Sequence, residues 1–184
     1  GQLLSTRSDI LPESVLAELR KLQDTVAPMP PGAAQAIVER ELGAPVERLF
    51  ESFDPEPLGS ASIGQVHRAV LRDGRVVAVK VQRPEARPRV ESDLELMREL
   101  AAFIDRRFGE RIFVDVPGLV AEFEGVIRRE LDYTAEAENA RRFRANFAGS
   151  RVRIPAVHTD LSTSRVLTLE YVEGTRFYAI RPLL

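Results

Sequence analysis

A chain of 184 residues is long enough for one domain with a hydrophobic core, and 44% hydrophobic with 29% charged residues is typical of a folded globular protein. The 26 basic and 28 acidic residues leave a formal net charge of -2, so no overall field attracts nucleic acid, and we expect no nucleic-acid partner. The sequence has no cysteine and only two histidines, which excludes disulfides, thiolate metal sites and histidine-rich metal sites.

No apolar run approaches the ~18 residues that would span a bilayer, and the first ten residues lack the pattern of a secretory signal. We therefore expect a cytoplasmic location, with any membrane association peripheral. The chain begins with Gly1 and Gln2 and no methionine, so we expect further residues upstream in the parent protein. His67 and His158 have no second imidazole or carboxylate cluster beside them in sequence, which favours structural roles.

The first 43 residues predict a helical extension. Residues 12–26 begin with a proline suited to a first helical turn and repeat apolar residues every three to four positions, which indicates one apolar face. Prolines within 28–31 end this helix. A second helix is expected over about 33–42, with Gly43 as its C-terminal stop.

Beyond the prolines at 55 and 57 the chain becomes rich in valine. Residues 63–71 and 76–81 predict two strands, and the Asp-Gly pair between them predicts a tight hairpin. Apolar residues at helical spacing then predict a helix over about 90–108.

A further helical stretch begins at Pro117, and its apolar face rotates part-way along, so we expect a bend near Asp132. Residues 156–158 and 165–172 predict two more strands, and residues 173–175 predict a turn. These elements together predict an α+β fold built on an antiparallel sheet, with inserted helices and an N-terminal helical extension.

A run of small residues precedes the first predicted strand and matches the glycine-loop pattern G-x-G-x-x-G-x-V, with Ala61 in place of the middle glycine. Small residues let backbone N–H groups approach phosphate oxygens, and the valine can lie over a base. Taken alone, such a run is more often a Gly/Ser-rich connector. The residues that would contact a nucleotide are Gly59, Ser60, Ala61, Ser62, Ile63, Gly64 and Val66.

A lysine stands sixteen residues after Gly64 in the segment Val-Ala-Val-Lys-Val, which matches the strand motif V-A-I-K of kinases. Because side chains alternate along a strand, Ala78 and Lys80 should point to one face and the valines to the other. The alanine leaves room for an adenine ring, and the lysine can reach the α and β phosphates. An isolated strand lysine is usually a solvated edge residue, but loop, hairpin and lysine in this order favour a nucleotide site.

The acidic residues that follow leave several assignments open. Glu95 and Glu99 are rival partners for Lys80, because ordinary kinases place a glutamate on the first helix after the lysine strand. On a continuous helix Asp132 and Glu136 would share one face, where like charges need a cation such as Lys80 between them. Arginines at 128, 129, 141 and 142 equally allow a salt-bridged surface helix.

Four motifs in this order resemble those of the UbiB/ADCK family of atypical kinases, and the similarity covers nearly the whole chain. Residues 60–68 resemble the alanine-rich loop of that family, and residues 79–84 its lysine strand. Residues 130–132 are similar to its E-x-D motif, and residues 1–7 to the downstream part of its K-x-G-Q motif.

The resemblance implies a fold and roles for individual residues. It implies a helical extension over 1–43 and a kinase-like N-lobe over 44–184 that ends near the hinge. Lys80 would hold nucleotide phosphates and Glu136 would pair with it, the two being the catalytic candidates of this lobe. Glu170 and Val172 would lie in the hinge that binds adenine.

The same resemblance implies a regulatory contact. Glu130 and Asp132 would lie against the segment that contains Gly1 and Gln2 and obstruct a protein-substrate site. We also expect residues 1–26 to pack near this motif, because their helix carries an apolar face that needs cover.

The family's cofactor is ATP, so a nucleotide partner is implied. Magnesium is expected only with a large lobe in the parent protein, because the chain ends before a catalytic-loop aspartate and asparagine or a D-F-G aspartate. The chain alone is therefore expected to lack phosphoryl-transfer activity. Gly59 and Ser60 stand where the family has alanines, which affects the expected nucleotide preference.

The resemblance implies a role in isoprenoid quinone biosynthesis, including ubiquinone, with quinone-biosynthesis proteins or an isoprenoid lipid as partners. The alternative is a non-catalytic, pseudokinase-like binding module that acts through a protein or lipid partner. A third possibility is a structural adaptor in which the lysine and the carboxylates are surface charges.

Overall fold

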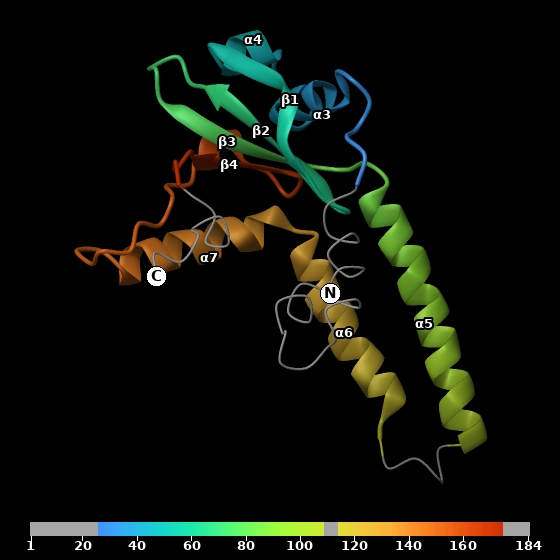
Figure 1. The fold of residues 1–184 in the computed structure, drawn as a ribbon. Helices are drawn as coiled ribbons and strands as arrows, with labels where there is room; N and C mark the ends of the chain where they lie inside the picture. The colour runs from blue at the N-terminus through green and yellow to red at the C-terminus, as the bar shows by residue number, and fades with distance from the viewer. Residues whose placement is uncertain (1–25, 109–113, 175–184) are drawn as a thin grey trace, which may run out of the picture.

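The computed structural model describes residues 26–108 and 114–174. The expected helix over 12–26, the segment with Gly1 and Gln2, and the expected packing of that segment on the E-x-D motif lie outside the described residues. All elements below carry the labels of Figure 1.

The first described elements are two helices. Helix α3, Ala33–Leu42, has the expected bounds and ends at Gly43, which takes a left-handed φ of 71° and donates its N–H to Glu39 O. Helix α4, Val46–Leu49, was not predicted, because four residues are too few to show a helical period.

Four antiparallel strands form one sheet in the order β1-β2-β3-β4 (Figure 1), which confirms the predicted antiparallel sheet. Strands β2, Gly64–Val70, and β3, Val76–Gln82, form the expected hairpin. At its turn the N–H of Leu71 donates to Arg75 O, and Gly74 has a φ of 84°, which favours glycine.

Strand β1, Ser52–Ser60, was not predicted, since it contains two prolines. It lies at the edge of the sheet, where a residue without an N–H is tolerated, and its pairing with β2 shifts register twice, between Phe53 and Pro57 and between Pro57 and Gly59. The glycine-rich run therefore begins inside this strand, since Gly59 and Ser60 are the last two residues of β1.

Strand β4, Val166–Glu170, lies within the expected range of 165–172. The strand expected at 156–158 reduces to one bridge between Val157 and Leu169, because the chain turns immediately into a short 3-10 helix, η2, at Thr159–Leu161. That prediction was wrong in extent.

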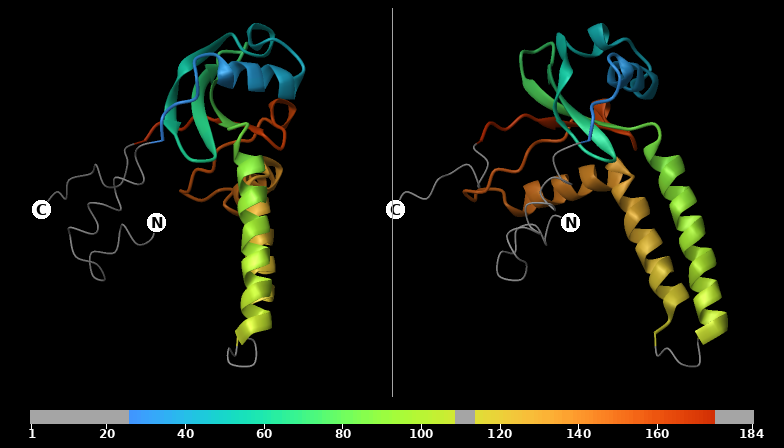
Figure 2. Two further views of the ribbon diagram at one scale, coloured as in Figure 1. Left: turned by 90° about the vertical axis from the view of Figure 1, so that its right-hand side faces the viewer. Right: turned by 45° about the vertical axis from the view of Figure 1, so that its right-hand side comes forward.

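Helices α5, Ala86–Phe108, and α6, Val116–Glu130, form an antiparallel hairpin that projects away from the sheet (Figures 1 and 2). Helix α5 begins earlier than the expected residue 90. Arg128 bridges the two helices, 2.8 Å from Glu91 and 2.5 Å from Glu124. None of the helices in 26–108 and 114–174 is both long and apolar enough to cross a membrane.

The helical stretch breaks where a bend was expected. Helix α6 ends at Glu130, and helix α7, Tyr133–Asn146, begins after Asp132, whose side chain accepts the N–H of Thr134 at 3.0 Å. The continuous helix considered for the Asp132 and Glu136 pair is therefore wrong. Asp132 serves instead as the N-cap of α7.

The sheet separates two apolar clusters. Val77, Val79 and Val81 are fully buried on the face covered by α3, while Leu167 packs with Tyr133 of α7 on the other face. The predicted alternation along β3 is confirmed. Residues of α3 and of the sheet belong to the same core cluster. The boundary proposed between residues 43 and 44 stays a prediction.

The cap at Asp132 generates a stability prediction. Asp132→Ala should lower the free energy of unfolding by about 1 kcal/mol, because the Thr134 N–H loses its acceptor. Asp132→Asn keeps an acceptor oxygen and should retain most of that stability. Urea denaturation followed by circular dichroism measures both, and equal losses in the two variants would contradict the capping role.

Candidate nucleotide site

An ion pair joins the sheet to helix α7 at the predicted site. The Lys80 ammonium of β3 lies 2.5 Å from a carboxylate oxygen of Glu136, in the first turn of α7. The Lys80 side chain is 29% exposed and that of Glu136 is 44% exposed. The pairing expected for Glu136 is therefore present, and the described residues show no ion pair between Lys80 and the rival Glu95 or Glu99.

An aromatic ring lies beneath the lysine. The Lys80 ammonium is 4.6 Å from the ring centroid of Tyr133, a favourable cation–π geometry. Tyr133 is fully buried, and burial raises the pKa of its hydroxyl above its ordinary value. The sequence analysis did not single out Tyr133, because no local pattern links an aromatic residue on one helix to a lysine on a distant strand.

The glycine-rich run is mostly strand. Gly59 and Ser60 end β1, Gly64 begins β2, and only residues 61–63 form the turn, which closes through the Ala61 N–H and Gly64 O at 2.8 Å. The predicted eight-residue loop is thus a three-residue turn with exposed residues at Ala61 and Ser62.

Register places the other predicted contacts on the lysine's face. Val66 lies directly opposite Lys80, and residues directly opposite in an antiparallel pair share a face. Ala78 lies on the same side of β3 by alternation and opposite Leu169 of β4. Val66 and Ala78 are both half-buried. This face therefore carries small apolar side chains, which suit a base, and a cation, which suits phosphates.

A cavity of about 400 Å³ opens beside the ion pair between α6 and α7. Glu130 of the E-x-D motif lines it together with Lys80 and Glu136, whereas Asp132 does not. The structure thus separates the motif's two carboxylates, with Glu130 facing the lysine's cavity and Asp132 capping α7. The remaining lining residues are Val126, Arg129, Ala135 and Asn139.

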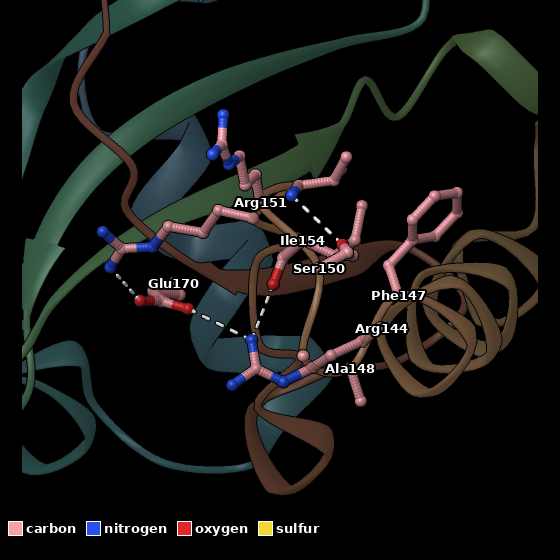
Figure 3. Close-up of a pocket in the computed structure, with 10 residues that line it drawn as sticks. Arg144, Phe147, Ala148, Ser150, Arg151, Ile154 and Glu170 are labelled. Atoms are coloured by element: carbon pink, nitrogen blue, oxygen red, sulfur yellow. Dashed lines mark hydrogen bonds and ion pairs between the residues drawn. The ribbon is translucent and has the colours of Figure 1, made fainter.

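The expected hinge residue Glu170 uses its carboxylate within the protein. Arg153 donates to it at 2.5 Å and the Ala156 N–H at 3.0 Å, and the Arg153 bond is the main cause that lowers the pKa of Glu170. Arg144 lies 3.5 Å away (Figure 3), and the group lines a second cavity of about 380 Å³. The Glu170 N–H also donates to Ala156 O at 2.8 Å, so any hinge contact of Glu170 to adenine would use its backbone carbonyl. Val172 follows β4 and is exposed.

Comparison with known proteins adds an independent finding. Residues 21–183 match the model of the ABC1 atypical kinase-like domain. The chain belongs to the ABC1 family. This confirms the resemblance found in the sequence, and it identifies the described fold as a kinase-like N-lobe.

This ABC1 chain is similar to several curated proteins and to a solved structure. It is 43% identical over 179 residues to "Protein ACTIVITY OF BC1 COMPLEX KINASE 7, chloroplastic" of Arabidopsis thaliana, covering 96% of this chain and 25% of that protein. It is 41% identical over 175 residues to "Probable protein kinase UbiB" of Marinobacter nauticus, covering 95% and 32%. The structure of Rv3197 from Mycobacterium tuberculosis, in complex with erythromycin, superposes with a TM-score of 0.71 at 32% identity.

The ABC1 chain spans about a quarter to a third of those curated relatives and 44% of the solved Rv3197 chain, while 95% of it is covered in that structural match. The roles assigned to its site residues stay predictions, which rest on the Lys80–Glu136 ion pair and on the register of β2 and β3.

The two glycines that flank the turn, Gly59 and Gly64, should differ in how much stability is lost when each is replaced by alanine. A Cβ on Gly64 would lie 2.6 Å from the Tyr133 hydroxyl and 2.7 Å from Val81 O, whereas a Cβ on Gly59 would meet open space. Gly64→Ala should lower the free energy of unfolding by about 1 to 3 kcal/mol through overpacking. Gly59→Ala, the matched control, should change it by less than about 0.5 kcal/mol. Thermal and urea denaturation of both variants test this, and a Gly64→Ala protein as stable as the control would contradict the close approach.

The exposure of the ion pair predicts a small contribution to stability. Glu136→Gln should lower the free energy of unfolding by less than about 1 kcal/mol, because water screens a pair this exposed. Glu138→Gln, which removes the partner of Arg141 at 3.3 Å on the same helix, is the matched control. A loss above about 3 kcal/mol for Glu136→Gln alone would mean that Lys80 is effectively buried in solution.

Proposed function

We propose that this chain is the nucleotide-facing lobe of a UbiB-type atypical kinase or ATPase, and that it binds ATP. The observation that carries the proposal is the Lys80–Glu136 pair, which fixes a partly exposed ammonium opposite Val66, on the strand that follows the turn at residues 61–63. A kinase needs this pairing because the glutamate holds the lysine where the nucleotide phosphates lie.

The chemistry of the lysine supports the proposal. An ammonium has three donors, so Lys80 can keep its bond to Glu136 and still donate to phosphate oxygens. Its exposed fraction of 29% leaves room for that second contact. The Tyr133 ring beneath it limits where the ammonium can move, which lowers the entropy lost on binding.

The remaining parts of the site divide the nucleotide between them. Val66 and Ala78 offer apolar surface for the base, and Ser62 and Ile63 of the turn offer backbone N–H groups to the phosphates, while the Ala61 N–H closes the turn. ATP, when bound, supplies the phosphoryl group, and magnesium would neutralise its charge if the parent protein provides a large lobe. Glu136 then keeps Lys80 oriented while Lys80 binds the phosphates.

Membership of the ABC1 family, with a relative named UbiB, supports a further part of the proposal, a role in isoprenoid quinone biosynthesis. We propose that the protein carries out this role in the cytoplasm, with at most a peripheral membrane association. Partners would be quinone-biosynthesis proteins or an isoprenoid lipid. The alternative, a non-catalytic module that acts through such a partner, is favoured by exposed apolar side chains repeated along α5 and α6, Leu96, Leu100, Phe103, Leu119, Phe123 and Val126.

Nucleotide titration tests the proposal directly. The 184-residue chain should bind ATP in the high micromolar to millimolar range, about 4 to 6 kcal/mol, since one lobe leaves the phosphates in contact with water. Lys80→Met should weaken this binding at least about tenfold, because a charge-assisted contact is lost. Arg141→Met removes a cation from the pair with Glu138 on the same helix and is the matched control, with binding expected to be unchanged.

Calorimetry or amide chemical-shift titration measures these affinities. Equal binding by the wild type and Lys80→Met would contradict the proposal, and equal weakening by both variants would point to a general charge effect. ATP binding that depends on Lys80, in a parent protein that shows no phosphate transfer or release above background, would favour the non-catalytic alternative.

A further inference from the structure

One arginine behind the turn is buried and has an unusual set of partners. Arg83 follows β3 directly, three residues after Lys80, and is only 8% exposed. Its Nε donates to Ala61 O at 3.0 Å, and its Nη2 donates to Ser60 Oγ at 2.8 Å and to Ala27 O at 2.6 Å. Its backbone N–H donates to Ile63 O at 2.9 Å.

These bonds fix the turn from one side. Three of the four acceptors belong to residues 60, 61 and 63, so one residue contacts most of the segment between β1 and β2. The turn also closes on itself through Ala61 and Gly64. A turn fixed at its carbonyl oxygens keeps its N–H groups in a constant direction, which lowers the reorganisation needed when an anion binds.

The charge of Arg83 is only weakly compensated. Its hydrogen-bond acceptors are neutral, and its described ionic partner, Glu85, lies 3.7 Å away with a side chain that is 59% exposed. A guanidinium keeps its charge when buried, and the field of a charge is stronger in a region with little water. The turn therefore lies in a positive potential.

The bond to Ser60 adds a directional effect. Because Arg83 donates to the Ser60 oxygen, the hydroxyl hydrogen of Ser60 remains available to donate elsewhere. Ser60 is half-buried at the end of β1, next to the exposed Ala61. Because Arg83 bonds to the oxygens of the turn and of Ser60, it leaves the N–H groups of Ser62 and Ile63 and the Ser60 hydroxyl as donors.

We propose that Arg83 is a positioning residue that gives the turn its affinity for the phosphates of a nucleotide, as distinct from the base. This rests on the proposed nucleotide function and adds a residue to it that does not itself touch the ligand. The site would then hold a polyphosphate by two cations, with Lys80 in front of the phosphates and Arg83 behind the turn.

The experiment compares a ligand with phosphates to one without. Arg83→Lys keeps a charge but loses the forked bonds, so it should weaken ATP binding about tenfold while leaving adenosine binding unchanged. Amide chemical-shift titration reaches the weak affinities expected for both ligands. Arg72→Lys is the matched control, because Arg72 also donates to main-chain carbonyls, those of Glu47 and Arg48, at the opposite end of the β2–β3 hairpin.

Each outcome decides the matter. Equal ATP affinity in the wild type and Arg83→Lys, or an equal loss for ATP and adenosine, would overturn the inference while leaving the proposed function in place. A wild type that binds neither ligand would overturn the proposed function, and this inference with it. If Arg83→Lys does not fold, Ser60→Ala removes a single acceptor and should weaken ATP about threefold with adenosine again unchanged.

Discussion

The architecture depends on the break between helices α6 and α7. Gln82 at the end of β3 donates to Leu131 O at 2.8 Å, and Arg87 donates to the same oxygen at 2.9 Å. The carbonyl at the end of α6 is thereby occupied by side chains, the helix stops, and Asp132 caps a new helix that runs under the sheet. Without this break the chain would not turn to run under the sheet, where the first turn of α7 brings Glu136 to Lys80 (Figure 1).

Strand β3 serves the core and the site with alternate residues. Its valines fill the cluster against α3, while Ala78, Lys80 and Gln82 face α7. At the end of the strand the contacts divide again, because Gln82 holds the α6–α7 break and Arg83 holds the turn after β1. One strand therefore sets the distance between the turn at residues 61–63, the lysine and the helix that carries the glutamate.

Features that depend on residues close together in the chain could be predicted from the sequence, whereas features that depend on distant segments could not. The hairpin, α3 and the alternation along β3 could be predicted, because Asp-Gly, a terminal glycine and alternate valines are local signals. Strand β1 could not, since its prolines argue against a strand and only its edge position permits them. Glu136 was assigned to Lys80 through a family resemblance alone, and spacing favoured Glu95 or Glu99 equally.

The contacts of Tyr133 and Arg83 lay beyond sequence reasoning for another reason. The Tyr133 hydroxyl approaches the backbone of Gly64, and Arg83 bonds to main-chain oxygens, so neither pairing involves a complementary residue type. A carbonyl acceptor is present at every position and leaves no pattern in the sequence. Such contacts become visible only when the fold brings the segments together.

Arginine and lysine make different kinds of contact in this chain. Of 26 basic residues only two, Lys21 and Lys80, are lysines. Arginines make the structural contacts, such as those of Arg83, Arg87 and Arg153, because a planar fork can satisfy several acceptors at once. Lys80 has one carboxylate partner and a compact ammonium that stays accessible. An arginine there could bond Glu136 equally well, but its larger head would occupy the space above Tyr133. The lysine gives little stability at that position and leaves room for an anion, which is the property a nucleotide site requires.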